Sequence, residues 1–182
     1  VRHGTSQADV RFRALCRRLT AETDVEEIGR RLAHELCLVM ETDATLVLVG
    51  EGTTARWSGT RLVAGGATPV MLWADDPVLR SVIATAADNP RPDTPAVSDG
   101  VLFDLIPDLS LLAPITYQHE LVGVVGVGPR TDGRPHDQDA WEWLEEFCER
   151  VAPYLRIHLH YNSNSADAMT GLTLPDEDRS AM

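Results

Sequence analysis

The sequence predicts an α+β domain, with an antiparallel sheet packed against helices from both ends of the chain. Two apolar runs at 110–117 and 121–128 are separated only by residues 118–120, a link that fits a hairpin and leaves no room for a crossover. The run 44–50 is rich in β-branched residues and too short for an independent helix, so it is predicted as a strand. Apolar residues at helical spacing near both ends predict helices that share one face of the sheet.

Two helices are predicted before the first strand. The first spans residues 6–22, and its apolar residues, spaced three and four apart, are Phe12, Leu15 and Leu19. The second begins after Asp24, whose side chain suits a helix N-cap, and runs to about Met40. Its apolar stripe consists of Val25, Ile28, Leu32, Leu36 and Val39.

Further strands are predicted after residue 50. Residues 54–59 form a second strand, and 61–63 together with 70–73 supply an additional one. Gly65-Gly66 marks the loop between these two parts. Together with the hairpin, the residues therefore predict four or five strands.

A helix and a long loop separate these strands from the hairpin. Asp75-Asp76-Pro77 combines an acidic cap with an early proline, so a helix is predicted from there to about Ala87. The proline-rich stretch 89–100 is predicted as a surface loop, and 101–105 as a short helix or an irregular turn. Long loops in compact domains often cover binding sites, so this loop is a candidate lid.

The last predicted helix starts near Asp137 and runs to about His160, with Pro153 as the expected position of a kink. It carries a heptad series: Trp141, Leu144, Cys148, Val151, Leu155 and His158. We expect this series to be the seam of a homodimer formed through the terminal helices. The alternative is a single amphipathic helix on its own sheet. Glycines within 121–128 are expected where this helix approaches the sheet closely.

Composition excludes several classes of protein. The net charge is −12 and all sixteen basic residues are arginines, so the chain lacks the basic face that a nucleic-acid binder needs. No apolar run approaches the roughly 18 residues of a membrane span, and the first residues lack the apolar core of a signal peptide. The three scattered cysteines fit a reducing compartment. We therefore expect a cytoplasmic protein with no nucleic-acid or membrane partner.

The chain resembles a GAF domain over about residues 10–158. The resemblance rests on the second helix, on the closing helix and on the hairpin, where the matching residues are Pro114, Glu120, Leu121, Val122, Gly123 and Val124. It implies a GAF-like central antiparallel sheet of five to six strands. The N-terminal and C-terminal helices would cover one face, and a helix plus loops would cover the other. Residues 1–9 would form an N-terminal extension.

The resemblance also implies a sensory or regulatory module without a cofactor. The chain has no lysine for a cyclic-nucleotide signature, and Cys16, Cys37 and Cys148 lie in helical patterns and not in a pocket where a bilin or a sulfoxide could react. No histidine spacing suits haem or a metal ion. No catalytic triad or phosphate-binding glycine loop is visible either, so no enzymatic activity is expected.

Residues 167–172 resemble the D-x-L-T-G-L opening of a GGDEF (diguanylate cyclase) domain, although the next residues, 173–176, depart from that family's pattern. The match implies that 159–182 form a signalling linker and the start of an output domain in cyclic-di-GMP signalling. A chance match is the alternative.

A ligand pocket is expected beneath the proline-rich loop. Its candidate apolar residues are Trp57, Trp73, Leu102, Phe103 and Leu112, and its candidate polar anchors are Arg56, Arg80 and Asp104. The alternative is that the aromatic residues are simply core. The predicted function is a sensory domain that binds a small molecule and relays the signal through its C-terminal helix. A ligand-free dimerisation and relay module is the alternative.

Overall fold

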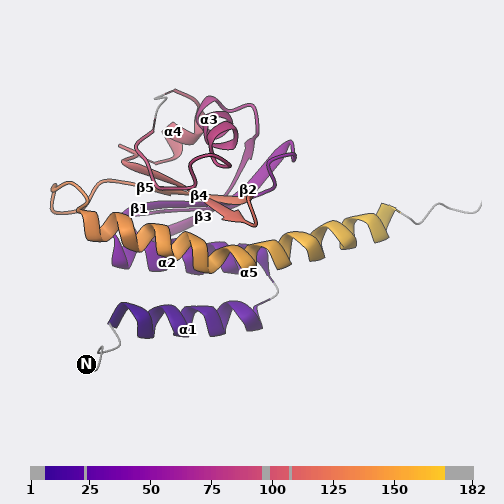
Figure 1. Ribbon diagram of the computed structural model, residues 1–182, viewed down its shortest axis with the longest axis horizontal. Helices are drawn as coiled ribbons and strands as arrows, with labels where there is room; N and C mark the ends of the chain where they lie inside the picture. Colours follow the sequence, from indigo (N-terminus) through magenta and orange to yellow (C-terminus); the bar gives the residue numbers. More distant parts are fainter. Residues whose placement is uncertain (1–6, 23, 96–98, 107, 171–182) are drawn as a thin grey trace, which may run out of the picture.

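The computed structural model describes residues 7–22, 24–95, 99–106 and 108–170 (Figure 1). It contains one five-stranded antiparallel sheet with the strand order β3-β2-β1-β5-β4. The elements are α1 Gln7–Ala21, α2 Val25–Val39, β1 Ala44–Val49, β2 Arg56–Val63, β3 Gly66–Trp73, α3 Pro77–Thr85, α4 Val101–Leu105, β4 Leu111–Tyr117, β5 Glu120–Val127 and α5 Gln138–Thr170. The predicted α+β class is confirmed.

The sheet separates two apolar cores. On one face, α2 and α5 pack against the sheet and α1 lies farther out, in contact with both helices (Figure 1). On the other face, α3 and α4 cover a second core. The terminal helices therefore share one face, as predicted. The central strand β1 is buried on both sides, which explains why all of its residues but Thr45 are apolar; the Thr45 hydroxyl donates to the Ala33 carbonyl at 2.8 Å.

The predicted hairpin is confirmed, and its turn has a clear backbone cause. Gln118 and His119 both have positive φ, at 50° and 69°, and this left-handed pair is the arrangement that matches the twist of a two-residue hairpin loop. In β5, a Cβ built on Gly123 would lie 3.1 Å from a methyl group of Leu155 in α5. The closing helix therefore does approach a glycine in this strand.

The second strand is longer than predicted. Residues 54–59 and 61–63 were expected in different strands, whereas β2 runs without a break from Arg56 to Val63. Gly59, the last residue of the predicted second strand, lies inside β2, and its missing side chain leaves room for the neighbouring backbone. A Cβ at Gly59 would lie 1.8 Å from the Val47 carbonyl oxygen.

The edge strand β4 is partly covered by the proline-rich loop. Asp93 and Leu112 exchange two backbone hydrogen bonds of 2.8 Å, so the loop adds a one-residue bridge beyond the edge. Pro114 lies two residues along the same edge, where its missing N–H leaves no donor for another strand. The loop is thereby held beside β4.

The closing helix is longer than predicted and contains Pro153 within its course. It continues to Thr170, ten residues beyond the expected end at His160, because no glycine or proline interrupts residues 160–170. Its last part extends past the sheet (Figure 1). The described helices include none that is long and apolar enough to cross a membrane.

Some predictions fall outside the described residues. Residues 1–6 of the predicted extension, 96–98 of the proline-rich loop, and 171–182 of the GGDEF-like segment lie there. The part of that segment that the structure describes, up to residue 170, is helical.

Candidate ligand-binding site

A cavity of about 270 Å³ lies between α3, the loop 88–95 and the edge strand β4; we call it the α3–β4 cavity. Its apolar side is formed by Val78, Val82, Leu112 and Pro114. Val78 and Leu112 belong to the core beneath α3. The cavity therefore lies beneath the proline-rich loop, on the face of the sheet opposite α5.

The wall formed by α3 is held by one buried carboxylate. Asp76 caps the helix through Oδ1, which accepts hydrogen bonds from the N–H groups of Val78 at 3.1 Å and Leu79 at 3.2 Å. Its Oδ2 accepts the N–H of Leu102 in α4 at 3.1 Å. Asp76 is buried, so these bonds fix α3 and α4 relative to each other.

The polar side of the cavity contains groups with spare hydrogen-bonding capacity. Thr85 donates its hydroxyl to the Ser81 carbonyl at 3.0 Å, as is common within a helix. The Ser81 hydroxyl, the Asn89 amide and the Thr94 hydroxyl make no hydrogen bond with other described residues. These groups are free to bind a polar molecule or water.

Three charged residues also line the cavity. Asp88 and Asp93 form no ion pair with any other described residue, although Asp93 Oδ1 accepts the N–H of Thr94 at 2.8 Å. Arg91 forms a 3.4 Å ion pair with Glu145 of α5. The loop beside the cavity thus reaches around the β4 edge to the closing helix.

The structure places one of the predicted ligand-binding residues, Leu112, in the α3–β4 cavity. Trp57 and Leu102 are fully buried in the core beneath α3 and α4, and the indole N–H of Trp57 has no partner among the described residues. Phe103 packs at the border of the same core. Their core positions match the alternative that the sequence left open.

The remaining four predicted residues lie on the surface and do not line the cavity: Trp73, Arg56, Arg80 and Asp104. Trp73 is 57% exposed and lies under the Arg56 guanidinium, which is 5.8 Å from the ring centroid. Arg80 donates to the backbone carbonyl of Asp75 at 2.9 Å, and Asp104 is exposed. The structure therefore does not bring these eight residues together around one space.

Sequence reasoning missed Ser81, Thr85 and the charged loop residues. A signal was present, because Ser81 and Thr85 are four apart and form a polar stripe on α3 beside its apolar one. The loop residues could be located only once the Asp93–Leu112 bridge fixed the path of the loop.

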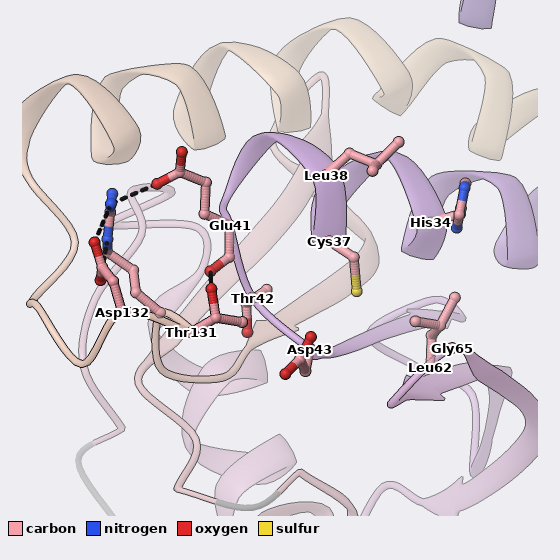
Figure 2. Close-up of a pocket in the computed structure, with 11 residues that line it drawn as sticks. His34, Cys37, Leu38, Glu41, Thr42, Asp43, Leu62, Gly65, Thr131 and Asp132 are labelled. Carbon is pink, nitrogen blue, oxygen red and sulfur yellow. Dashed lines mark hydrogen bonds and ion pairs between the residues drawn. The ribbon is translucent and has the colours of Figure 1, made fainter.

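A larger groove of about 580 Å³ lies at the C-terminal end of α2 (Figure 2). Arg130 forms ion pairs with Glu41 and Asp132, two of the residues labelled in Figure 2. The hydrogen bond from Arg130 holds the pKa of Asp132 well below its ordinary value. Thr131 also donates its backbone N–H to the Glu41 carbonyl at 2.9 Å. Because these groups already bind one another, they hold the loop before α5 against the C-terminal end of α2.

The cysteines are poor candidates for reaction centres. Burial raises the pKa of Cys37, whose sulfur lies 3.3 Å from the Thr45 hydroxyl, and burial likewise raises the pKa of Cys16 and Cys148. All three thiols therefore stay protonated near neutral pH, which makes them weak nucleophiles. Among the described residues no cluster of side chains could hold a metal ion.

The predicted dimer seam lies mainly inside the protomer. Four of its six residues are buried against the sheet and the other helices: Leu144, Cys148, Val151 and Leu155. Trp141 and His158 are half-buried. Farther along α5, Ile157 is 51% exposed. The heptad series is thus used for packing on the chain's own sheet, and a dimer through α5 would require other residues as well.

No protein-family model and no curated protein matches the chain, but solved structures match its fold. The GAF domain of a phosphoenolpyruvate-protein phosphotransferase from Coxiella burnetii superposes with a TM-score of 0.59 at 14% identity, over 88% of this chain and 99% of that one. The corresponding Acinetobacter domain has a TM-score of 0.54 at 11% identity, over 86% and 96%. A methyl-accepting chemotaxis protein, residues 122 to 287, has a TM-score of 0.56 at 15% identity, over 79% and 96%. The chain therefore has the GAF-domain fold, as the sequence resemblance implied.

Proposed function

We propose that this chain is a sensory or regulatory GAF domain. It binds a small molecule in the α3–β4 cavity and relays this event through α5 to an output domain. The observation that carries the proposal is the position of β4, a single strand that forms part of both the cavity wall and the surface under α5.

The alternation of side chains along β4 supports this relay. Leu112 and Pro114 line the cavity, whereas Leu111, Ala113 and Ile115 belong to the core under α5 on the opposite face. A ligand that displaces β4 or its bridged loop would therefore change the surface on which α5 lies. Because packed cores do not deform continuously, such a change favours one of two discrete helix positions.

Ion pairs at the β1–β2 turn and at the β4–β5 hairpin also hold α5 against the sheet. Arg156 pairs with Glu51 of the β1–β2 turn at 3.0 Å and with Glu120 of the hairpin at 3.1 Å. This contact lies one residue after Leu155, which is still buried against the sheet, and the last part of the helix extends past the sheet (Figure 1). In the proposal, movement of the helix beyond Arg156 reaches the output domain, a GGDEF-like domain in cyclic-di-GMP signalling. The proposed assembly is a homodimer through the terminal helices.

A second candidate function is a ligand-free dimerisation and relay module. It is favoured by Trp57, whose side chain is fully buried and fills the interior beneath α3 and α4, where a larger ligand would otherwise lie. Under this alternative the α3–β4 cavity holds only water.

Native mass spectrometry of the purified chain, combined with a cavity-filling variant, separates the two functions. Ser81→Phe places a ring in the cavity wall, and Ala84→Phe adds the same ring on an exposed position of α3 outside it. The ligand-binding function predicts a retained small molecule that Ser81→Phe loses and Ala84→Phe keeps. Recovery of apo protein in all three samples, with no ligand found by screening metabolite extracts, would support the ligand-free module.

A further inference from the structure

From the charges around the α3–β4 cavity we infer that its ligand is a small zwitterion, with an ammonium group and a carboxylate on an apolar body. We also infer that Arg91 is the residue through which this ligand acts on α5. Both inferences rest on the proposed function, because they specify the ligand and the regulation of the same site.

Charges of both signs face the same cavity. Asp88 and Asp93 have no cationic partner among the described residues, so their carboxylates are available to an ammonium group. Arg91 supplies a guanidinium, whose planar fork binds a carboxylate through two parallel hydrogen bonds. Asp88, Arg91 and Asp93 are exposed, so water solvates their charges before a ligand binds. A ligand with a single charge would pair with only one sign of this lining, whereas a zwitterion pairs with both.

The rest of the lining restricts the size and character of the ligand. Val78, Val82 and Leu112 present an apolar surface, which suits a short aliphatic group. The volume of about 270 Å³ lies just below the range of roughly 300–1,000 Å³ that holds drug-sized ligands. An amino acid with a small apolar side chain combines all of these features.

The ion pair between Arg91 and Glu145 provides the route to α5. Its two side chains are 74% and 36% exposed and lie 3.4 Å apart, so water screens the attraction and the pair is easily exchanged. A ligand carboxylate bound by Arg91 would replace the Glu145 carboxylate. The loop would then lose its ionic contact with α5 when the ligand binds.

This exchange makes ligand binding and the Arg91–Glu145 pair mutually exclusive. Since the ligand must first break this pair, removing Glu145 should tighten ligand binding by the free energy that the pair contributes. Since an exposed pair contributes at most about 1 kcal/mol, the expected gain in affinity for Glu145→Gln is up to about fivefold.

Isothermal titration calorimetry on the full chain tests the ligand class. The probes are glycine, L-valine and L-leucine, with isopentylamine and 4-methylpentanoate as leucine analogues that each lack one charge. We expect at least one amino acid to bind, and leucine's single-charge analogues to bind at least about tenfold more weakly than leucine or not at all. Absence of binding by all three amino acids, or equal binding of a single-charge analogue, would overturn the zwitterion inference.

Three variants test the role of Arg91. Arg91→Gln should weaken binding of the amino acid at least about tenfold, whereas Arg80→Gln removes the same charge from α3 outside the cavity and should leave affinity unchanged. Glu145→Gln should bind more tightly than the wild type. Unchanged binding by Arg91→Gln or by Glu145→Gln would overturn the coupling, and thermal melts would verify that all variants are folded.

The failures of the two proposals are distinguishable. If the amino acids fail to bind while native mass spectrometry recovers another molecule that Ser81→Phe loses, the zwitterion inference is wrong and the sensory function stands. If no molecule is recovered, the screen of metabolite extracts finds no ligand and the amino acids fail to bind, both are wrong.

Discussion

Asp76 shows how one side chain can fix the position of a binding wall. Its two oxygens accept N–H groups from Val78, Leu79 and Leu102, so it satisfies donors at the start of α3 and ties that helix to α4. Asp75-Asp76-Pro77 predicted the helix cap from the sequence, but the hydrogen bond from Leu102, 26 residues away, depends on the tertiary fold.

The first prediction follows from these bonds. Asp76→Ala leaves the first turn of α3 uncapped and the buried N–H of Leu102 unpaired, so we expect a loss of about 2–3 kcal/mol in the free energy of unfolding. Asp75→Ala, at the exposed neighbouring position, should change it by less than about 0.5 kcal/mol. Urea titrations of both variants measure the difference. Equal effects would show that the cap contributes little.

A second prediction concerns pH and the buried thiol of Cys148. Burial raises the pKa of this thiol in the folded protein, whereas in the unfolded chain the same thiol has the ordinary cysteine pKa of about 8.5. A raised pKa contributes stability below the unfolded value, and that contribution is lost as pH rises above it.

The free energy of unfolding should therefore fall between about pH 7.5 and about pH 9.5. In Cys148→Ala it should fall less, because the contribution of this thiol is gone. It should still fall somewhat, because Cys16, Cys37 and Tyr154 also have raised pKa values. Urea midpoints at the two pH values, each compared within one variant, give the measurement. Cys16→Ala is the control for the half-exposed thiol on α1, with a smaller expected effect. An identical pH dependence for wild type and Cys148→Ala would contradict the argument.

At the scale of elements, the pairing of β1 and β2 depends on a close backbone approach. Gly59 in β2 lies so near Val47 that a side chain has no space, and β2 continues through this residue, where the sequence predicted the strand to end. Such a contact cannot be read from strand propensity, since glycine is ordinarily unfavourable within a strand.

The third prediction uses this contact. Gly59→Ala would bring its Cβ to 1.8 Å from the Val47 carbonyl oxygen, so the central strands must separate or shift. We expect a loss of at least about 3 kcal/mol, above the usual cost of overpacking because the clash is with backbone. Gly52→Ala, whose Cβ would meet nothing within 4 Å, is the matched control. Chemical denaturation measures the free energy of unfolding of both variants. Equal stability would show that the close approach of Gly59 to Val47 does not limit this position.

At the scale of the whole molecule, the order and type of most elements could be predicted from local signals, whereas 61–63 were assigned to the wrong strand and 101–105 were left open between a helix and a turn. Examples of these signals are the apolar stripe of α2, the Asp76-Pro77 start of α3, and the short link in the hairpin. The α3–β4 cavity could be placed only in outline. The sequence located the loop above it, but Trp57 and Trp73 occur in equally apolar contexts, and only the fold shows that one is buried and the other exposed.

The last prediction concerns assembly. The heptad residues Leu144 to Leu155 are used inside the protomer, so a dimer through the terminal helices must rely on apolar residues that remain exposed. Val10 on α1 and Ile157 on α5 are 57% and 51% exposed, on the two helices expected at the interface. We expect a dimer that Ile157→Arg converts to a folded monomer, because this position lies outside the core and a buried unpaired charge would oppose association.

Leu38→Arg is the matched control, since Leu38 is similarly exposed but lies on α2 beside the groove of Figure 2. It should leave the dimer intact. Native mass spectrometry and sedimentation velocity report the mass of each variant, and circular dichroism reports its helix content. A wild-type chain that stays monomeric at high concentration would refute the dimer, whereas equal dissociation by Leu38→Arg would move the interface toward α2. In the expected case, the residues that join two copies lie on α5 just beyond Arg156, so a helix shift on the sheet would change the interface directly.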